Sequence, residues 1–128
     1  MEQKRKILVI DDDRLVLKSL ANLLKQQGYD VVCASDGPEA ESLLRKALPN
    51  LIVCDIRMPR QDGVTVIRNL KRISREETGV EIPFIFITGY ASEEAPIDAV
   101  KLGAKDYLLK PFDLDEFLKS VGEHVRAG

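Results

Sequence analysis

The chain has 128 residues, of which 45% are hydrophobic and 31% are charged, and its formal net charge is −2. This size and balance predict one globular domain over residues 1–128, and the slightly acidic charge argues against a surface that neutralises nucleic-acid phosphates. No apolar run reaches the length of a membrane span, so we expect a cytoplasmic protein that contacts neither membranes nor nucleic acid directly. Cys33 and Cys54 lie in apolar runs and are expected to be small core residues in a reducing compartment.

The first half of the chain alternates short apolar runs with segments that have the apolar spacing of helices. Each run has the length of a strand buried on both faces, and the three runs lie at residues 7–10, 31–34 and 51–54. The first helix is expected to be capped by Asp13 and to end at Gly28. The second is expected to begin near Pro38 and to bury Ala47 in its apolar stripe before Pro49 ends it.

The second half continues the same alternation. Apolar spacing over residues 66–73 marks a third helix, and the polar stretch 74–81 predicts an exposed connection. Two further strands are predicted at residues 83–87 and 106–109, and a weak helical pattern between them ends at Gly103. The last helix is expected to begin after Asp113, three residues before Glu116. Its predicted buried face consists of Leu114, Phe117, Leu118, Val121 and Val125.

Five strands that alternate with five helices predict an α/β fold, a (βα)5 doubly wound five-stranded parallel sheet in the flavodoxin-like order 2-1-3-4-5. In such a fold the carboxyl ends of the strands share one edge of the sheet, and the first and third strands flank the switch point. Polar residues follow four of the five strands. We therefore expect one shallow cleft that contains Asp11, Asp12, Asp55, Thr88 and Lys110.

These residue types together indicate phosphoryl chemistry. Three neighbouring carboxylates repel one another unless a cation joins them, and Mg²⁺ prefers a few oxygen ligands with water and phosphate oxygens. A carboxylate such as Asp55 can also act as a nucleophile toward phosphorus. Lys110 and Thr88 could then contact the transferred group. Singly, Thr88 is a common turn residue and Lys110 a common surface charge, so the prediction depends on their joint placement.

The motifs at these positions extend over most of the chain. They are the run from Ile7 to Asp12, Asp55-Ile56-Arg57-Met58-Pro59 with Asp62-Gly63 behind it, Ile87-Thr88-Gly89, and the stretch from Gly103 to Phe112. With these motifs in this order, the whole chain resembles a receiver domain of the two-component response-regulator family. Residues 88–96 also look similar to the receivers of nitrogen-regulator-type transcription activators.

The resemblance implies a phosphorylatable signalling switch, not an enzyme that acts on other molecules. Asp55 would accept a phosphoryl group from a sensor histidine kinase or a histidine phosphotransfer protein. Thr88 and Lys110 would contact that group, and Tyr107 matches the aromatic residue that turns inward when the threonine moves. The resemblance also implies a Mg²⁺ site made by Asp11, Asp12, Asp55 and the backbone carbonyl of Arg57.

The output of the switch would be the face built by the fourth helix, the fifth strand and the fifth helix. That face could serve an effector domain, a downstream protein or a homodimer formed on phosphorylation. We also expect the phosphorylated state to be long-lived. Arg57 and Tyr90 lie two positions beyond Asp55 and Thr88, and neither side chain is suited to orient an attacking water.

Three other functions fit parts of the pattern. A magnesium-dependent phosphohydrolase could use the same aspartyl phosphate, but such enzymes usually carry a second acid where this chain has Arg57. A flavin-binding module would need a phosphate loop after the first strand, where Asp11, Asp12 and Asp13 would repel a phosphate. A pseudo-receiver that only binds partners would not need the intact acidic and phosphate-contacting positions of this sequence.

Overall fold

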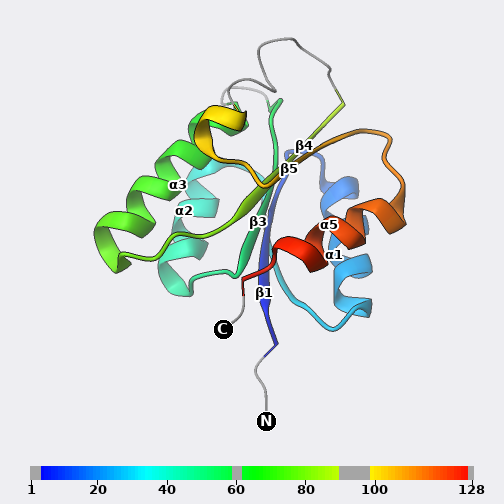
Figure 1. The fold of residues 1–128 in the computed structure, drawn as a ribbon, viewed down its shortest axis with the longest axis horizontal. Helices are drawn as coiled ribbons and strands as arrows, with labels where there is room; N and C mark the ends of the chain where they lie inside the picture. Colours follow the sequence, from blue (N-terminus) through cyan, green and yellow to red (C-terminus); the bar gives the residue numbers. More distant parts are fainter. Residues whose placement is uncertain (1–3, 59–61, 90–98, 127–128) are drawn as a thin grey trace.

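The computed structural model describes residues 4–58, 62–89 and 99–126, and it has a central parallel sheet with helices on both faces (Figure 1). The strand order is β2-β1-β3-β4-β5, as predicted. Each strand begins and ends within one residue of its predicted position. Their bounds are Lys6–Ile10 for β1, Asp30–Ala34 for β2, Leu51–Asp55 for β3, Phe84–Thr88 for β4 and Asp106–Leu109 for β5.

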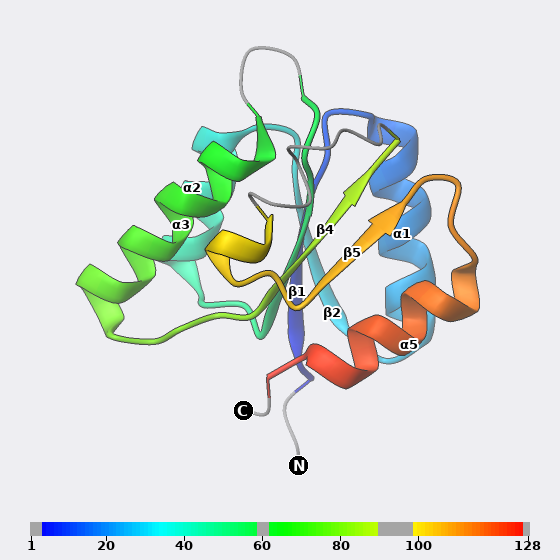
Figure 2. The ribbon, with the colours of Figure 1, turned by 45° about the horizontal axis from the view of Figure 1, so that its top comes forward.

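The helices lie in two layers (Figures 1 and 2). One face of the sheet carries α1 (Arg14–Gln26) and α5 (Leu114–His124), and the other carries α2 (Gly37–Lys46) and α3 (Gly63–Thr78). Residues 99–102 are also helical, whereas the rest of the predicted fourth helix lies outside the described residues. Within the described part of the chain, no helix has the length and apolar character that crossing a membrane requires.

The sheet separates two apolar cores because successive side chains of a strand point to opposite faces. Leu8, Ile52 and Phe86 pack under α2 and α3, and Val9 and Ile85 pack under α1 and α5. Every residue of β3 and β4 is buried, which explains why both appear in the sequence as unbroken apolar runs. The last residue of each run, Asp55 or Thr88, is therefore held in place by an almost fully buried strand.

Aspartates fix the beginnings of the helices. Asp13 caps α1 as predicted, with its side chain accepting hydrogen bonds from the backbone N–H groups of Leu15 and Val16. Asp36, Asp62 and Asp113 cap the other three labelled helices in the same way. Each carboxylate satisfies backbone donors that have no partner within the helix. The loops that surround the carboxyl edge of the sheet are thereby tied to the first turns of helices.

The prediction of an exposed connection over residues 74–81 was wrong for residues 74–78, which are helical, although residues 75–79 are exposed as expected. The helix α3 continues to Thr78 and ends at Gly79, whose φ of 72° is the left-handed conformation that favours glycine. Ser74 is buried, and its hydroxyl donates a hydrogen bond of 2.6 Å to the carbonyl of Val80. Residues 75–78 are exposed on the continuing helix, so the polarity of this stretch did not indicate a loop.

Two smaller predictions of burial were also wrong, both at helix ends. Ala47 is the exposed C-cap residue of α2, where the chain has turned to an extended conformation. Leu114 is 55% exposed because it lies in the first turn of α5, beyond the apolar core that Phe117 and Val121 enter.

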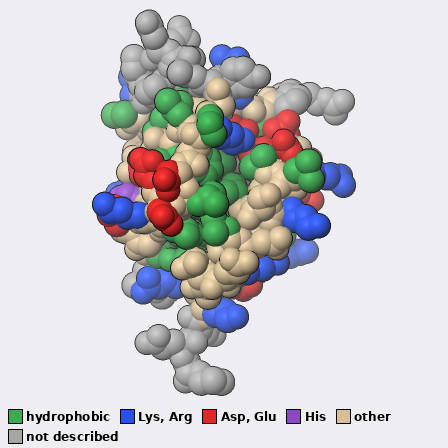
Figure 3. Space-filling view, turned by 90° about the vertical axis from the view of Figure 1, so that its right-hand side faces the viewer, with side chains coloured by type: hydrophobic (Ala, Val, Ile, Leu, Met, Phe, Trp, Pro, Cys, Tyr) green, Lys and Arg blue, Asp and Glu red, His purple; other side chains and the backbone are tan. Residues whose placement is uncertain are grey.

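Figure 3 views the molecule from the side of α1 and α5 and shows apolar side chains at the surface with acidic side chains gathered beside them. Cys54 is buried as predicted, whereas Cys33 is only partly buried, and both are free thiols.

Candidate functional site

A cleft of about 480 Å³ opens at the edge of the sheet where the strands end. This is the predicted location, at the switch point between β1 and β3. Most of its lining residues are charged, and they come from segments that lie far apart in the sequence. They are Asp11, Asp12, Asp13, Asp55, Arg57, Met58, Gly89 and Lys110.

Three carboxylates form the acidic part of the cleft. One oxygen from each of Asp11, Asp12 and Asp55 lies within 4.8 Å of the other two. Asp11 is fully buried and Asp55 is 5% exposed, whereas Asp12 is exposed to solvent. The three residues thus combine two fixed carboxylates with one that faces water. Oxygen donors of this kind suit a hard divalent cation that keeps part of its hydration shell.

Lys110 connects two of these carboxylates. Its Nζ atom lies 2.8 Å from Oδ2 of Asp11 and 3.2 Å from Oδ2 of Asp55. The backbone N–H of Lys110 donates a hydrogen bond of 2.7 Å to the carbonyl of Thr88, which holds the start of this loop against the end of β4. The peptide bond between Lys110 and Pro111 is cis. The ammonium group of Lys110 bridges Asp11, which follows β1, and Asp55, which ends β3.

Backbone groups next to Asp55 hold its carboxylate and the end of β3 in position. The backbone N–H of Arg57 donates a hydrogen bond of 3.2 Å to Oδ1 of Asp55, and that of Gly63 donates one of 2.6 Å to the carbonyl of Ile56. A Cβ atom on Gly63 would overlap the carbonyl oxygen of Asp55. The first turn of α3 can approach the end of β3 this closely only because residue 63 is glycine.

The pKa values of the cleft residues reflect burial and the crowding of the carboxylates around Lys110. Burial and the charge of Asp11 raise the pKa of Asp55 from 3.8 to about 6, although Lys110 lowers it. Partial desolvation also raises the pKa of Asp12, with a smaller upward contribution from Asp11. Burial opposes the charge of Lys110, but the hydrogen bond and charge of Asp11, together with Asp55, outweigh burial and raise the pKa of its ammonium group.

The other predicted residues lie around this centre. Thr88 is fully buried at the end of β4, next to the cleft but not among its lining residues. Arg57 is exposed and lines the cleft. Tyr107 pairs with Phe86 in the register of β4 and β5, and among the described residues its buried hydroxyl has no hydrogen-bond partner. Tyr90 lies outside the described residues.

Sequence reasoning did not identify two contributions to the site. The close approach of Gly63 to Asp55 was hidden in an Asp-Gly pair that also suits an ordinary loop. Met58 and Gly89 line the cleft without a charge that would have marked them. None of these three residues has a charged side chain that would mark it as part of the site.

The sequence is similar to those of known proteins. The family model described as the response regulator receiver domain matches residues 7–122. A response regulator MprA from Mycobacterium sp. (strain KMS) is 42% identical over 113 residues, which cover 88% of this chain and 47% of that protein. The chain thus spans about half the length of curated relatives such as this one.

Solved structures show the same fold. The Vibrio cholerae chemotaxis protein CheY4 superposes with a TM-score of 0.85 at 27% identity, covering 95% of this chain and 99% of that one. A Burkholderia pseudomallei response regulator, described with a phosphorylated aspartic acid, a calcium ion and citrate, superposes with a TM-score of 0.80 at 30% identity and covers 91% of this chain and 66% of that one. The chain therefore belongs to the receiver domain family of the response regulators of two-component systems.

Proposed function

We propose that the chain accepts a phosphoryl group on Asp55 and acts as a signalling switch whose only chemistry is on itself. The single observation that carries this proposal is the buried Asp55 carboxylate, which lies 3.2 Å from the Lys110 ammonium and within 4.8 Å of two further carboxylates. A structural aspartate would not need this environment, since burial and the charge of Asp11 raise the pKa of Asp55 and so destabilise its ionised form.

The transfer is a displacement at phosphorus. An oxygen of the Asp55 carboxylate supplies the electron pair for the new P–O bond, and the P–N bond of a phosphohistidine donor breaks. The imidazole leaves with that electron pair. Lys110 lies close enough to Asp55 to neutralise charge on a phosphoryl oxygen, and the Thr88 hydroxyl would bond a second one. Positioning and charge neutralisation supply most of the catalysis in phosphoryl transfer.

The carboxylates of Asp11, Asp12 and Asp55, together with the backbone carbonyl of Arg57, would hold Mg²⁺. The donor set fits this ion, because it consists of oxygens from one exposed and two buried carboxylates. When bound, the metal would neutralise the repulsion among these groups and the charge on the phosphoryl oxygens. The B. pseudomallei relative, described with both a phosphorylated aspartic acid and a calcium ion, supports this arrangement.

The switch would run from Thr88 to Tyr107. If the Thr88 hydroxyl moves toward the phosphoryl group, it leaves space beside β4, and the Tyr107 side chain can enter that space from β5. The Tyr107 hydroxyl has no hydrogen-bond partner among the described residues, so its inward movement would break no hydrogen bond with them. The face made by residues 99–102, β5 and α5 would then change its shape and its partners.

The partners follow from this chemistry. The donor would be a sensor histidine kinase or a histidine phosphotransfer protein in the cytoplasm. Relatives such as the MprA response regulator are about twice as long as this chain, which supports an effector domain or a separate downstream protein as the recipient of the signal. The switched face could also form a homodimer with a second copy of the chain.

The phosphorylated state would be long-lived, because Arg57 lines the cleft and, with Tyr90, would restrict the access of water to the phosphorus atom.

Intact-mass spectrometry tests the proposal. The protein is incubated with Mg²⁺ and acetyl phosphate, and one added phosphoryl group is expected in the parent and none in Asp55→Asn. Asp13→Asn is the matched control, since asparagine caps a helix as well as aspartate does and residue 13 lies in the same cleft. Equal incorporation in Asp55→Asn and the parent would refute the assignment of Asp55.

A further inference from the structure

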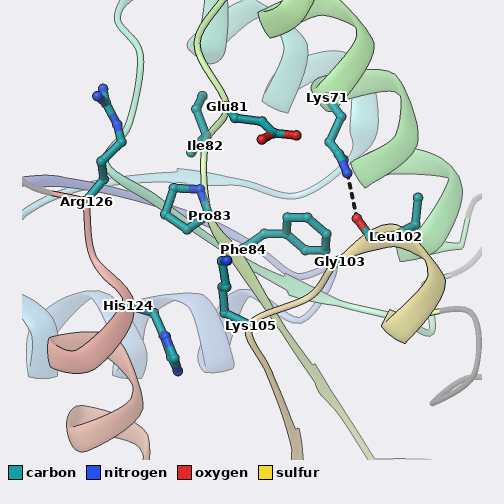
Figure 4. Close-up of a pocket in the computed structure, with 10 residues that line it drawn as sticks. All are labelled: Lys71, Glu81, Ile82, Pro83, Phe84, Leu102, Gly103, Lys105, His124 and Arg126. Carbon is teal, nitrogen blue, oxygen red and sulfur yellow. Dashed lines mark hydrogen bonds between the residues drawn. The ribbon is translucent and has the colours of Figure 1, made fainter.

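A second cavity lies at the opposite edge of the sheet, where β4 and β5 begin. Its volume is about 440 Å³, within the range of small-molecule sites. Figure 4 shows its walls, which come from α3, the start of β4, the turn that precedes β5, and the end of α5. The length of a strand, roughly 15 Å, separates it from the acidic cleft, so nothing in the proposed phosphoryl transfer uses it.

The charge of this cavity is opposite to that of the acidic cleft. Lys71, Lys105 and Arg126 line it, and Glu81 is the only acidic residue in its described lining. Within the described part of the chain, no carboxylate lies within 4.0 Å of a side-chain nitrogen of these three cations. The buried Nε atom of Arg126 also has no hydrogen-bond partner there. The described lining thus has three cations and one carboxylate, and none of the three cations forms an ion pair with a described carboxylate.

The floor of the cavity is apolar. Ile82 and Phe84 are buried core residues that also line the cavity, and Pro83 lies between them. The Nζ atom of Lys71 lies 5.5 Å from the centroid of the Phe84 ring. This combination suits a ligand with a small apolar body and one anionic group. The apolar body would contact Ile82, Pro83 and Phe84, and the anionic group would contact the lysine side chains.

Lys71 also links the cavity to the output side of the domain. Its ammonium group donates a hydrogen bond to the carbonyl of Leu102, the last helical residue before Gly103, as the close-up shows (Figure 4). Gly103 has a φ of 90° and turns the chain toward β5. An ammonium group has three donors, so Lys71 can contact an anion while it holds the end of this helical segment.

We propose that this cavity binds a small organic anion, a carboxylate or phosphate group carried on a compact apolar body, with Lys71 and Lys105 holding the charge. A bound anion would fix the Lys71 ammonium beneath Leu102. Because residues 99–102 belong to the proposed output face, ligand binding would bias that face from the side opposite Asp55. The two sites would then bias the same element from opposite ends of the sheet.

Amide NMR titration of the full chain tests this inference, with benzoate as the probe at constant ionic strength. Benzamide supplies the same apolar body without charge, and inorganic phosphate supplies charge without the body. We expect benzoate alone to give saturable shifts at Phe84 and at residues 102–105, with a dissociation constant of about 1 mM or tighter. Asp55→Asn should bind benzoate like the parent, which separates this site from the proposed phosphoryl transfer.

Three variants at exposed residues decide whether the cavity carries the binding. Lys105→Gln should weaken benzoate binding by about threefold and Glu81→Gln should tighten it, because each changes one charge in the lining. Lys101→Gln is the matched control, since Lys101 is exposed on the adjacent helical segment but does not line the cavity. Linear shifts without saturation, equal shifts with benzamide, or equal affinities in all three variants would overturn the proposal.

Discussion

The ionisation of Asp55 affects the stability of the metal-free domain. The folded-state pKa is about 6, raised from 3.8 chiefly by burial and by the charge of Asp11. Between these two values the folded protein keeps a proton that the unfolded chain has lost. Raising the pH through this window therefore favours unfolding. Above about pH 6 the ionised Asp55 costs the folded state about 2–3 kcal/mol.

Asp55→Asn should remove this cost. In EDTA, its free energy of unfolding should exceed that of the parent by about 2 kcal/mol at pH 8 and by much less at pH 4. Urea unfolding at the two pH values measures the difference. Asp62→Asn, at an exposed capping residue, should not reproduce the gain at pH 8. If Asp55→Asn were no more stable than the parent at pH 8, the electrostatic description of the cleft would be wrong.

Lys110 offsets part of the carboxylate repulsion, so its removal should make stability depend on metal. Lys110→Met leaves the fully buried Asp11 and the nearly buried Asp55 without their shared cation. The free energy of unfolding should fall by about 2 kcal/mol or more at neutral pH without metal. Adding Mg²⁺ should restore more stability to this variant than it adds to the parent, because the metal replaces the missing positive charge.

Thermal unfolding with and without Mg²⁺ measures this effect. Lys119→Met is the control, because Lys119 is exposed on α5 and lies outside the cleft. A Lys110→Met protein that gains no more from Mg²⁺ than the parent does would mean that the metal does not replace the charge of Lys110 in the cleft.

At the scale of elements, the contact between the start of α3 and the end of β3 positions Asp55. Gly63→Ala should lower the free energy of unfolding by more than about 2 kcal/mol, because the new Cβ atom would overlap the Asp55 carbonyl. It should also slow phosphorylation. Gly122→Ala is the matched control: a Cβ there meets no atom within 4 Å, and alanine favours a helix by about 1 kcal/mol over glycine. Urea unfolding of both variants tests this contrast, and equal effects would contradict it.

The sequence predicts most elements well because their patterns are local. The β3 and β4 runs are buried on both faces, so continuous apolarity marked their positions to within one residue. The last turns of α3 were missed because arginine and glutamate suit a helix surface as well as a loop. Only the burial of Ser74 and the left-handed Gly79 distinguish the two, and both depend on the folded chain.

The candidate site shows the same division. Asp11, Asp55 and Lys110 could be predicted together, since parallel strands bring their carboxyl ends to one edge. Their hydrogen bonds could not be predicted. The bridging position of Lys110 depends on the path of the loop after β5, and the close approach of Gly63 depends on how α3 packs against β3. Such distances follow from tertiary packing and have no counterpart in residue spacing.

At the scale of the whole molecule, the acidic cleft and the proposed output face share β4 and β5. Beryllofluoride with Mg²⁺ mimics a phosphoryl group, and it should change amide hydrogen exchange over residues 99–109 and in the first turns of α5. The physical reason is the proposed exchange of space between Thr88 and Tyr107. Tyr107 pairs with Phe86 of β4, two positions before Thr88. The same addition to Asp55→Asn should change nothing. Changes confined to the residues that line the cleft would argue against this route.

The central claim is that Asp55 alone receives the phosphoryl group. Trypsin divides the candidate carboxylates, because residues 47–57 form one peptide in which Asp55 is the only acidic side chain, whereas Asp11, Asp12 and Asp13 fall in residues 7–14. Borohydride reduces an acyl phosphate to an alcohol and so marks the acceptor permanently. After reaction with acetyl phosphate and Mg²⁺, mass spectrometry should find homoserine at position 55 and no change in residues 7–14. Reduction at Asp11, Asp12 or Asp13 in place of Asp55 would contradict the account.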